Sequence, residues 1–445
     1  MSKHTNSIIS NNFKKYYTDL LILALPLLIG NLGHTLIGAE DVLVIAKYNI
    51  NSLAAISIAN SIIVTIFIFG LGIICAISII LSNMRGAKHG IKKHLLSTLI
   101  FSVITAFIFT ILCYSTKYII PYLGFEQVLI PYIQEYIAIV SFSMFGIFIF
   151  EGLKQFMQSY EIVKFPNILM LIAVVINLVF DIVFVFGCGF IPSMGSRGAA
   201  IATLSIRTLL GLIMLFYVFR FIDFKSQINF SYMIYLLKIG IPIGIGLFLE
   251  VLAFNIITVL VGRETGLLAA AHSILITITN ATFMVPLAIS TALSVKVAYY
   301  FGAKKTEGIK NFSIAGLILG VGFMACMGII LALFPIQIIS LFTNDEELLK
   351  ITVPIVSITA MYQIFDGLQV VSGGILKGFK MTKFVSGAVL FGYWAAGMPA
   401  ALLFVKKYGL SLRGYWLALA ISLCVMGFIQ AVTAKNKFNQ IKKNL

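Results

Sequence analysis

Charged side chains are scarce in this sequence: Asp, Glu, Lys and Arg make up 11% of its 445 residues, while 60% are hydrophobic. Soluble domains carry about 25% charged residues, so this scarcity excludes an ordinary soluble protein. The mean hydropathy of +1.04 indicates an integral membrane protein. The alternating segments of a transmembrane β-barrel are also lacking, since runs such as FSVITAFIFTILCY do not alternate. The sequence therefore predicts an all-α membrane protein.

Other features are rare or missing as well. The five cysteines are scattered through apolar segments, so we interpret them as small buried side chains, not as disulfides or metal ligands. No Ser/His/Asp spacing, HExxH motif or histidine cluster is present, which argues against an enzyme, and no cofactor is expected. The apolar stretch near the N-terminus lacks a small-residue cleavage site, so it should remain as the first span.

Long apolar runs fill the chain instead. A helix needs about 20 apolar residues to cross a bilayer, and the hydropathy pattern predicts twelve such spans. They are expected near residues 18–46, 52–82, 95–116, 128–153, 165–189, 196–219, 235–261, 266–299, 311–335, 348–373, 384–405 and 413–434.

The basic residues alternate with these spans. Although the net charge is +16, Lys and Arg do not form one patch, which argues against nucleic-acid binding; they recur in every second loop, as in Lys88 and Lys304. The loops between these contain fewer basic residues, and one of them, TNDEELLK, is acidic at 345–347. One deviant loop, with Lys406 and Lys407, does not overturn the bias. By the positive-inside rule, both termini are predicted to be cytoplasmic.

Short motifs recur at one offset. The pairs are 215 or 216 residues apart: Pro26 and Pro242, Leu53-Ala54-Ala55 and Leu268-Ala269-Ala270, Gly86-Ala87-Lys88 and Gly302-Ala303-Lys304, Glu151-Gly152-Leu153 and Asp366-Gly367-Leu368. Their common order predicts two homologous six-helix lobes. Six is an even number, so the lobes form a parallel repeat related by a pseudo-twofold axis along the membrane normal. The predicted domains are an N-terminal lobe at 1–219, a cytoplasmic connector at 220–234 and a C-terminal lobe at 235–445.

Ionisable residues inside spans indicate a functional site, because each costs ~2.5–3.5 kcal/mol at the bilayer centre. In the first lobe, Asp41 and Asp181 lie near the ends of two outward-running spans, and Thr203 lies early in the next inward-running span. Asn177 shares a helix face with Asp181 at i, i+4. These four side chains are predicted to lie at one depth and to offer oxygen ligands for Na⁺, or coupled carboxyl groups for H⁺.

A structural interpretation of the same residues stays open. Asp41 and Asp181 could satisfy helix ends or pair with Lys47 and Arg197, and Arg207 could pair with a carboxylate in the first lobe. Small polar residues often serve only helix packing in membranes.

The second lobe offers another set. Glu250 lies near the middle of the seventh span, and Asp366 lies in the tenth with Tyr362 one turn before it. None of these has a cation within reach on its own helix. Glu151 occupies the repeat position of Asp366, but Lys154 at i+3 can neutralise it, so a structural role is favoured there. Asp41, Asp181, Glu250 and Asp366 are the candidate Na⁺ ligands.

The arrangement resembles the multidrug and toxic compound extrusion (MATE) family over nearly the whole chain. The segments that carry the resemblance are the stretch around Asp41, then RGAKHG, NLVFDIVFVFG, GAAIAT, FLEVLAFN, AAAHSI, FMVPLAIS and FDGLQVVSGGILKG. The chain looks more similar to NorM-like than to DinF-like members, although Ser273 replaces an amide common in NorM-like members. The resemblance implies two sets of cation-site positions: Asp41, Asn177, Asp181 and Thr203 in the first lobe, and Glu250, Tyr362 and Asp366 in the second.

The resemblance also implies a function. It predicts a multi-pass antiporter of the bacterial inner membrane that exports amphiphilic, often cationic organic compounds by alternating access, driven by Na⁺ or H⁺. The expected partners are these small molecules and the lipid bilayer, and a monomer is expected. The alternative is a flippase for lipids or lipid-linked oligosaccharides, from the wider superfamily. Only Arg207 is clearly basic within a span, which counts against the basic lining that a pyrophosphate substrate would need.

Overall fold

The computed structural model describes residues 2–219, 221 and 227–444, with side chains from residue 14 onward. Its helices are α1 (Ser2–Ala46), α2 (Ile50–Gly86), α3 (Leu95–Thr116), α4 (Ile130–Ser159), α5 (Lys164–Phe186), α6 (Ser196–Phe219), α7 (Phe230–Gly262), α8 (Gly266–Gly302), α9 (Thr306–Leu333), α10 (Pro335–Ser340), α11 (Glu346–Gly378), α12 (Thr382–Val389), α13 (Met398–Leu402) and α14 (Ser411–Asn444). The 3₁₀ turns η1 (Lys92–His94) and η2 (Ile120–Tyr122) and the π-helical segments η3 (Leu390–Gly397) and η4 (Leu403–Lys407) complete the described secondary structure.

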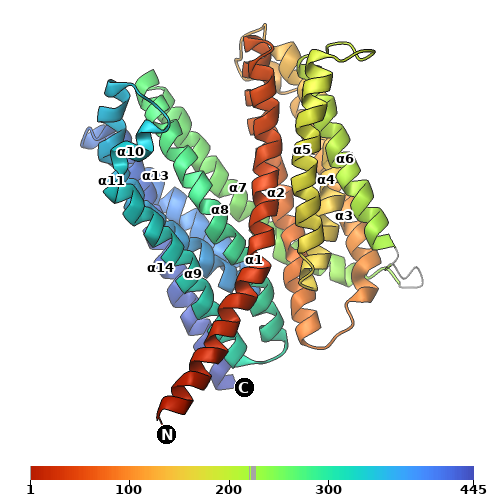
Figure 1. Ribbon diagram of the computed structural model, residues 1–445, viewed down its shortest axis with the longest axis vertical. Helices are drawn as coiled ribbons and strands as arrows, with labels where there is room; N and C mark the ends of the chain where they lie inside the picture. The colour runs from red at the N-terminus through yellow and green to blue at the C-terminus, as the bar shows by residue number, and fades with distance from the viewer. Residues whose placement is uncertain (1, 220, 222–226, 445) are drawn as a thin grey trace. The chain divides into compact units, whose positions relative to one another are not determined.

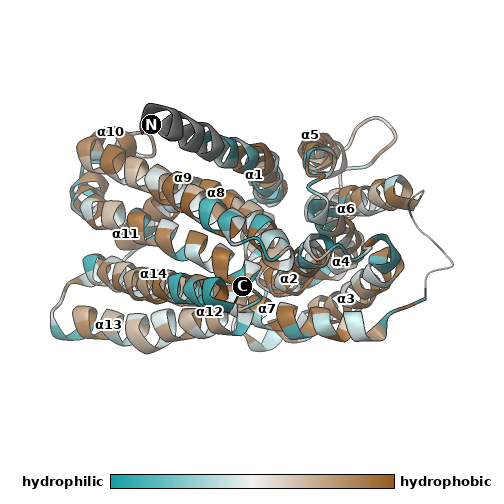
Figure 2. Cartoon of the chain, turned by 90° about the horizontal axis from the view of Figure 1, so that it is seen from below, coloured by the Kyte–Doolittle hydropathy of each residue, from teal (hydrophilic) through white to brown (hydrophobic). Residues whose placement is uncertain are grey.

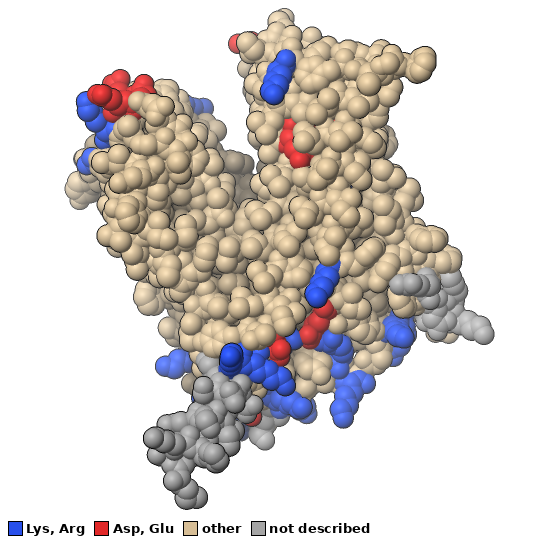
Figure 3. Space-filling model, viewed as in Figure 1, with Lys and Arg blue, Asp and Glu red and all other residues tan. Residues whose placement is uncertain are grey.

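Among the described residues, twelve helical stretches are long and apolar enough to cross a membrane. This confirms the all-α class and the twelve predicted spans. Hydrophobic residues recur along these helices in the colouring of Figure 2, and few charged side chains lie along the middle of the face shown in Figure 3. A helix satisfies its own backbone hydrogen bonds, which is why apolar runs of this length fold as helices in lipid.

The eleventh span, Thr382–Lys407, is not one regular helix. It combines α12 and α13 with the two π-helical segments η3 and η4. Pro399 stands between these segments at the start of α13, and proline cannot donate the backbone hydrogen bond that a regular α-helix needs. The sequence predicts a single span here and does not show this irregularity.

The chain forms two compact units, each built around one central helix. Unit 1 contains Met1–Leu28, Ser82–Lys88 and Ile245–Leu445, and within it α11 packs on α8, α9 and α14. Unit 2 contains Ile29–Leu81 and His89–Gly244, and within it α4 packs on α3 and α6, with α5 against α6 (Figure 1). The central helices α4 and α11 are the fourth and tenth spans, which the sequence repeat places in equivalent positions.

These units divide the chain by compactness, whereas the predicted lobes divide it by homology. The long helices α1, α2 and α7 contribute to both units, so the boundaries at 219 and 235 stay predictions. Within the predicted connector at 220–234, residues 220 and 222–226 lie outside the described residues. From Phe230 onward the connector is already part of α7.

The repeat is visible in the backbone. Lys88 and Lys304, 216 residues apart, both adopt left-handed conformations, with φ of 61° and 55°, just after α2 and α8. Within unit 1, the glycine at the end of each of these two helices lies close to the backbone of the other helix. A Cβ on Gly86 would lie 1.9 Å from the carbonyl oxygen of Tyr299, and a Cβ on Gly302 would lie 1.9 Å from that of Asn83. Only glycine allows these two helix ends to pack so closely.

Candidate functional site

In unit 2, helices α1, α5 and α6 bring four predicted site residues together. Asp41, Asn177, Asp181 and Thr203 are each at most 2% exposed. Thr203 Oγ1 donates to the Oδ2 of Asp41 at 2.9 Å. Asn177 Nδ2 donates to the Oδ2 of Asp181 at 2.9 Å and lies 3.4 Å from the Oδ1 of Asp41. We call these four residues and Tyr136 the Asp41 cluster.

Tyr136 was missed by the sequence analysis. It comes from α4 and donates its hydroxyl to the Oδ2 of Asp41 at 2.5 Å and to the Oδ1 of Asn60 at 3.2 Å. A charge-assisted O–H bond of this kind is among the stronger hydrogen bonds in proteins. Nothing in the sequence around Tyr136 sets it apart from the other aromatic residues of its span, so no pattern could have identified it.

The Asp41 cluster holds oxygen atoms without partners. The Oδ1 atoms of Asn177 and Asp181 are buried and accept no hydrogen bond. Glu40 adds a third carboxylate, with its Oε2 3.5 Å from Asn177 Nδ2. These two unpartnered oxygens and the Asp41 carboxylate form an electron-rich group of atoms that a small cation or a shared proton would satisfy.

The nearby basic residues do not neutralise this cluster through the predicted ion pairs. Arg197 lies 3.7 Å from the exposed Glu135. Arg207 donates from Nη1 to the hydroxyl of Ser143 at 3.1 Å and interacts electrostatically with Asp41. The cluster therefore keeps more carboxylate groups than hydrogen-bonded cations, which is costly in a membrane.

In unit 1, the structure gathers the second predicted set. Asp366 and Tyr362 lie one turn apart on α11, 2% and 4% exposed, and Glu250 on α7 is partly buried. Glu250 interacts electrostatically with Asp366, and Tyr393 donates its hydroxyl to the Oε1 of Glu250 at 3.4 Å. Two carboxyl groups in one apolar site repel each other when both are ionised, which favours keeping a proton or a cation there.

Two more residues of unit 1 belong to this environment. Lys377, eleven residues after Asp366 on α11, interacts electrostatically with Glu250. Its position on another helix explains why the sequence around Glu250 shows no cation. Trp416 is fully buried, and the ring of Tyr362 packs edge-on against it with centroids 5.5 Å apart. Packing against Trp416 fixes the orientation of Tyr362.

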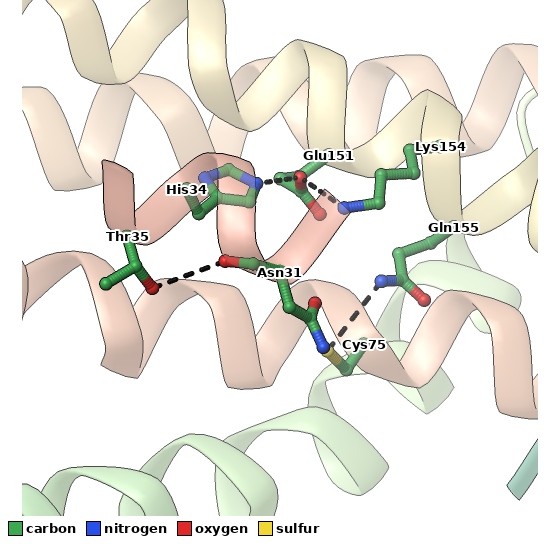
Figure 4. A network of polar contacts seen from close by, with 7 residues as sticks. All are labelled: Asn31, His34, Thr35, Cys75, Glu151, Lys154 and Gln155. Carbon is green, nitrogen blue, oxygen red and sulfur yellow. Dashed lines mark hydrogen bonds and ion pairs between the residues drawn. The ribbon is translucent and has the colours of Figure 1, made fainter. Parts of the chain in front are cut away.

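Glu151 is neutralised as its spacing predicts. Lys154 Nζ lies 3.0 Å from the Oε1 of Glu151, and His34 Nε2 lies 2.7 Å from the same atom (Figure 4). Glu151 is 1% exposed and Lys154 is 5% exposed. The charge of this buried carboxylate is already balanced, so Glu151 differs from its repeat counterpart Asp366.

Among the described residues, no three His, Cys, Asp or Glu side chains form a group arranged to hold a metal ion. A Na⁺ ion at the Asp41 cluster would need amide, hydroxyl or phenol oxygens besides the carboxylates, and Asn177, Thr203 and Tyr136 supply them. Such a mixed oxygen set suits a hard cation.

In the described part of the chain, twelve helices are long and apolar enough to cross a membrane, and both units bury carboxylates. This combination is typical of a polytopic membrane transporter. The family model described as MatE matches residues 26–183 and 242–403. The chain belongs to this family. Its two matched segments begin at Pro26 and Pro242, the first pair of the sequence repeat.

Relatives and solved structures agree with this assignment. Multidrug resistance protein NorM of Vibrio cholerae serotype O1 is 26% identical over 93% of this chain and 94% of the relative. A probable multidrug resistance protein NorM of Mesorhizobium japonicum is 29% identical over 94% and 93%. The crystal structure of the Vibrio cholerae MATE transporter VcmN in the bent form has a TM-score of 0.87 and 18% identity, covering 97% of this chain and 99% of that chain.

Proposed function

We propose that this protein is an antiporter that exports amphiphilic, often cationic organic compounds across the bacterial inner membrane in exchange for Na⁺ or H⁺. The observation that carries the proposal is the Asp41 cluster, in which two buried oxygens have no partner. Buried carboxylates with unpaired oxygens are costly in a membrane, and a bound cation offsets that cost. The buried position of the cluster makes that binding depend on the conformation of the surrounding helices.

The coupling follows from charge. A cationic substrate and the coupling ion both stabilise the ionised carboxylates, directly or through the conformation that these carboxylates favour, so binding of one releases the other. One monovalent cation entering through 100 mV supplies ~2.3 kcal/mol. Because 1.4 kcal/mol corresponds to a tenfold ratio, a single ion can sustain roughly a fortyfold substrate gradient.

Alternating access is the mechanism we propose for this exchange. The family membership and the two six-span repeats support it, since repeat-built transporters expose a fixed site first to one side and then to the other. The protein requires no cofactor in this scheme, and it works as a monomer with both termini in the cytoplasm.

A lipid or lipid-linked oligosaccharide flippase is the alternative. A pyrophosphate group would need several cations at the site, but the Asp41 cluster is acidic and Arg207 is already bonded to Ser143. Cationic substrates fit this charge better. The electrostatics therefore favour the antiporter.

The test is transport of a fluorescent organic cation in vesicles that contain the purified protein, with Na⁺ and H⁺ gradients imposed separately. We expect that imposing one of these two ion gradients accelerates transport of the organic cation in the direction opposite to the ion flow. If neither gradient accelerates it, the protein is not a cation-coupled antiporter. Movement of a labelled lipid-linked sugar without any gradient would favour the flippase.

A further inference from the structure

Two polar contacts join α4 and α6 at successive levels. Tyr136 on α4 and Thr203 on α6 both donate to the carboxylate of Asp41. Two turns further along α4, Ser143 accepts a hydrogen bond from Arg207, which follows Thr203 by one turn on α6. Residues at these spacings share a face of their helix. Arg207 is therefore a basic neighbour of the Asp41 cluster at the same helix–helix interface.

The backbone of Arg207 is fixed at this interface. A Cβ on Gly146 would lie 2.4 Å from the carbonyl oxygen of Arg207, and a Cβ on Gly211 would lie 2.6 Å from the carbonyl oxygen of Gly146. Helices α4 and α6 thus touch backbone to backbone beside Arg207, and only glycine allows this. The side chain of Arg207 is partly exposed, so it can turn while the helix that carries it stays in place.

Arg207 has few partners for a charged group inside a span. A guanidinium carries five N–H donors, and buried charges are normally paired. In the part of the chain that the structure describes, Arg207 makes one side-chain hydrogen bond, from Nη1 to the Oγ of Ser143 at 3.1 Å, and no ion pair. Ser143 donates its own proton to the carbonyl oxygen of Val140 at 2.6 Å, so its oxygen can accept from Arg207. This contact with a neutral hydroxyl leaves the charge of Arg207 unbalanced.

A charged partner lies one turn away. Arg207 interacts electrostatically with Asp41 and Tyr136. Thr203, which donates to Asp41, precedes Arg207 by about 6 Å along the axis of α6. Long side chains on a helix lean toward its N-terminus, which is the direction of Asp41. A change of side-chain rotamer can therefore turn the guanidinium from Ser143 toward Asp41 without movement of a helix.

We propose that Arg207 is a tethered cation that competes with Na⁺ for the carboxylate of Asp41. This inference rests on the proposed antiport function and commits the first-lobe site to Na⁺. When Na⁺ is bound at Asp41, the two cations repel each other and the guanidinium stays on Ser143. When Na⁺ leaves, the guanidinium turns to Asp41 and balances its charge.

This exchange explains how a buried site can release its ion. An ionised carboxylate left alone inside a span is costly, so a site without a substitute cation would hold Na⁺ tightly. Arg207 lowers the cost of release because its charge takes the place of the departing ion. The guanidinium cannot leave the protein, so it weakens Na⁺ binding without being transported itself.

Equilibrium binding of radioactive Na⁺ to the purified protein, without organic substrate, tests the competition. Arg207→Gln removes the competitor and should tighten Na⁺ binding roughly tenfold or more. Arg207→Lys keeps the positive charge and should bind Na⁺ nearly as weakly as the wild type. The matched control is Arg197→Gln, at the exposed start of α6, which should leave Na⁺ affinity unchanged.

A fixed positive charge would also weaken Na⁺ binding, and Ser143 distinguishes it from a mobile one. Ser143→Ala removes the second partner of the guanidinium, so Arg207 should spend more time on Asp41 and Na⁺ affinity should fall by up to roughly tenfold. In the Arg207→Gln background, the same change should have no effect. A guanidinium that does not move predicts wild-type Na⁺ affinity for Ser143→Ala. Ser141→Ala is the control, because Ser141 is equally buried and donates to Ala138 of its own helix.

The outcomes separate this inference from the proposed function. Unchanged Na⁺ affinity in Arg207→Gln or in Ser143→Ala would overturn the tethered cation and leave the antiport function untouched. If Arg207→Gln fails to insert, Ser143→Ala decides alone, because only a mobile guanidinium weakens binding there. A wild-type protein that binds no Na⁺ but exports in an H⁺ gradient would also overturn the tethered cation. A protein that shows the predicted Na⁺ shifts but exports in neither gradient would contradict the antiport function instead.

Discussion

Tyr136 donates its hydroxyl to the carboxylate of Asp41 across unit 2, with 2.5 Å between the Oη and Oδ2 atoms. The contact joins α4, the central helix of the unit, to α1. Thr203 donates to the same oxygen, so two hydroxyl groups hold Asp41 in one orientation. A carboxylate fixed in this way meets an incoming cation without first losing rotational freedom.

Removing the Tyr136 hydroxyl tests this preorganisation. A hydrogen bond to a charged group contributes about 1.5–3 kcal/mol, which corresponds to roughly a tenfold to hundredfold change in affinity. Tyr136→Phe, which leaves the ring in place, should weaken Na⁺ binding because the site loses a phenol oxygen, and should strengthen H⁺ binding because the hydroxyl no longer stabilises the ionised carboxylate. The measurement is the Na⁺ or H⁺ concentration that gives half-maximal export. Tyr132→Phe on the exposed face of α4 is the control. An unchanged half-maximal concentration would remove Tyr136 from the cation site.

Asp41→Asn should abolish cation-coupled export with normal protein level and membrane insertion. The amide keeps the size of the carboxylate and loses the charge that attracts the ion, so the driving energy of ~2.3 kcal/mol per ion at 100 mV is lost. Substrate should then equilibrate without accumulating. Accumulation at the wild-type level in the vesicle assay would show that Asp41 takes no part in coupling.

Glu250 and Glu151 provide a matched comparison. Glu250→Gln imitates the protonated acid permanently, so it should bind cationic drug weakly and lose export. Glu151 is balanced by Lys154 at 3.0 Å and hydrogen-bonded to His34 at 2.7 Å, and Glu151→Gln should cost much less export. Both variants are measured for drug binding and export between about pH 6 and pH 8, a range in which carboxyl groups of altered pKa titrate. Equal losses of export in the two variants, or full activity of Glu250→Gln, would show that coupling takes place at the Asp41 cluster alone.

Cysteine labelling in intact cells tests the topology. A cysteine in place of Asn344, just before α11, should react with an impermeant thiol reagent, whereas one in place of Lys92 in η1, just before α3, should not. The expectation follows from the loop charges and the positive-inside rule. The interpretation of all five cysteines as buried side chains is wrong for Cys188 and Cys326, which are exposed and must be replaced first. The reverse labelling pattern would show that the protein has the opposite orientation in the membrane.

Much of the fold follows from the sequence because the bilayer imposes simple rules. Apolar length sets the spans, and the motif offset of 215 or 216 residues sets the repeat. The convergence of Asp41, Asn177, Asp181 and Thr203 follows from counting the helical rise along spans that alternate in direction. Their role as cation ligands stays a prediction, as does that of the second set.

The remaining features depend on how the helices rotate and pack. Tyr136 reaches Asp41 only because α4 turns that face toward α1, and Lys377 interacts with Glu250 from a helix more than a hundred residues away. The π-helical segments of the eleventh span and the sharing of α1, α2 and α7 between two compact units also arise from packing. A hydropathy pattern records how much apolar surface a helix has, but not which neighbour it meets.

The central claim is that organic cation and coupling ion exclude each other at the buried carboxylates. It is tested most directly by adding a cationic substrate to purified protein at equilibrium and measuring displaced ion, with radioactive Na⁺ in one arm and proton release into weak buffer in the other. The account predicts that substrate displaces one of these ions from the wild-type protein and displaces less from Asp41→Asn. Substrate binding with no release of either ion, or equal release from both proteins, would contradict it.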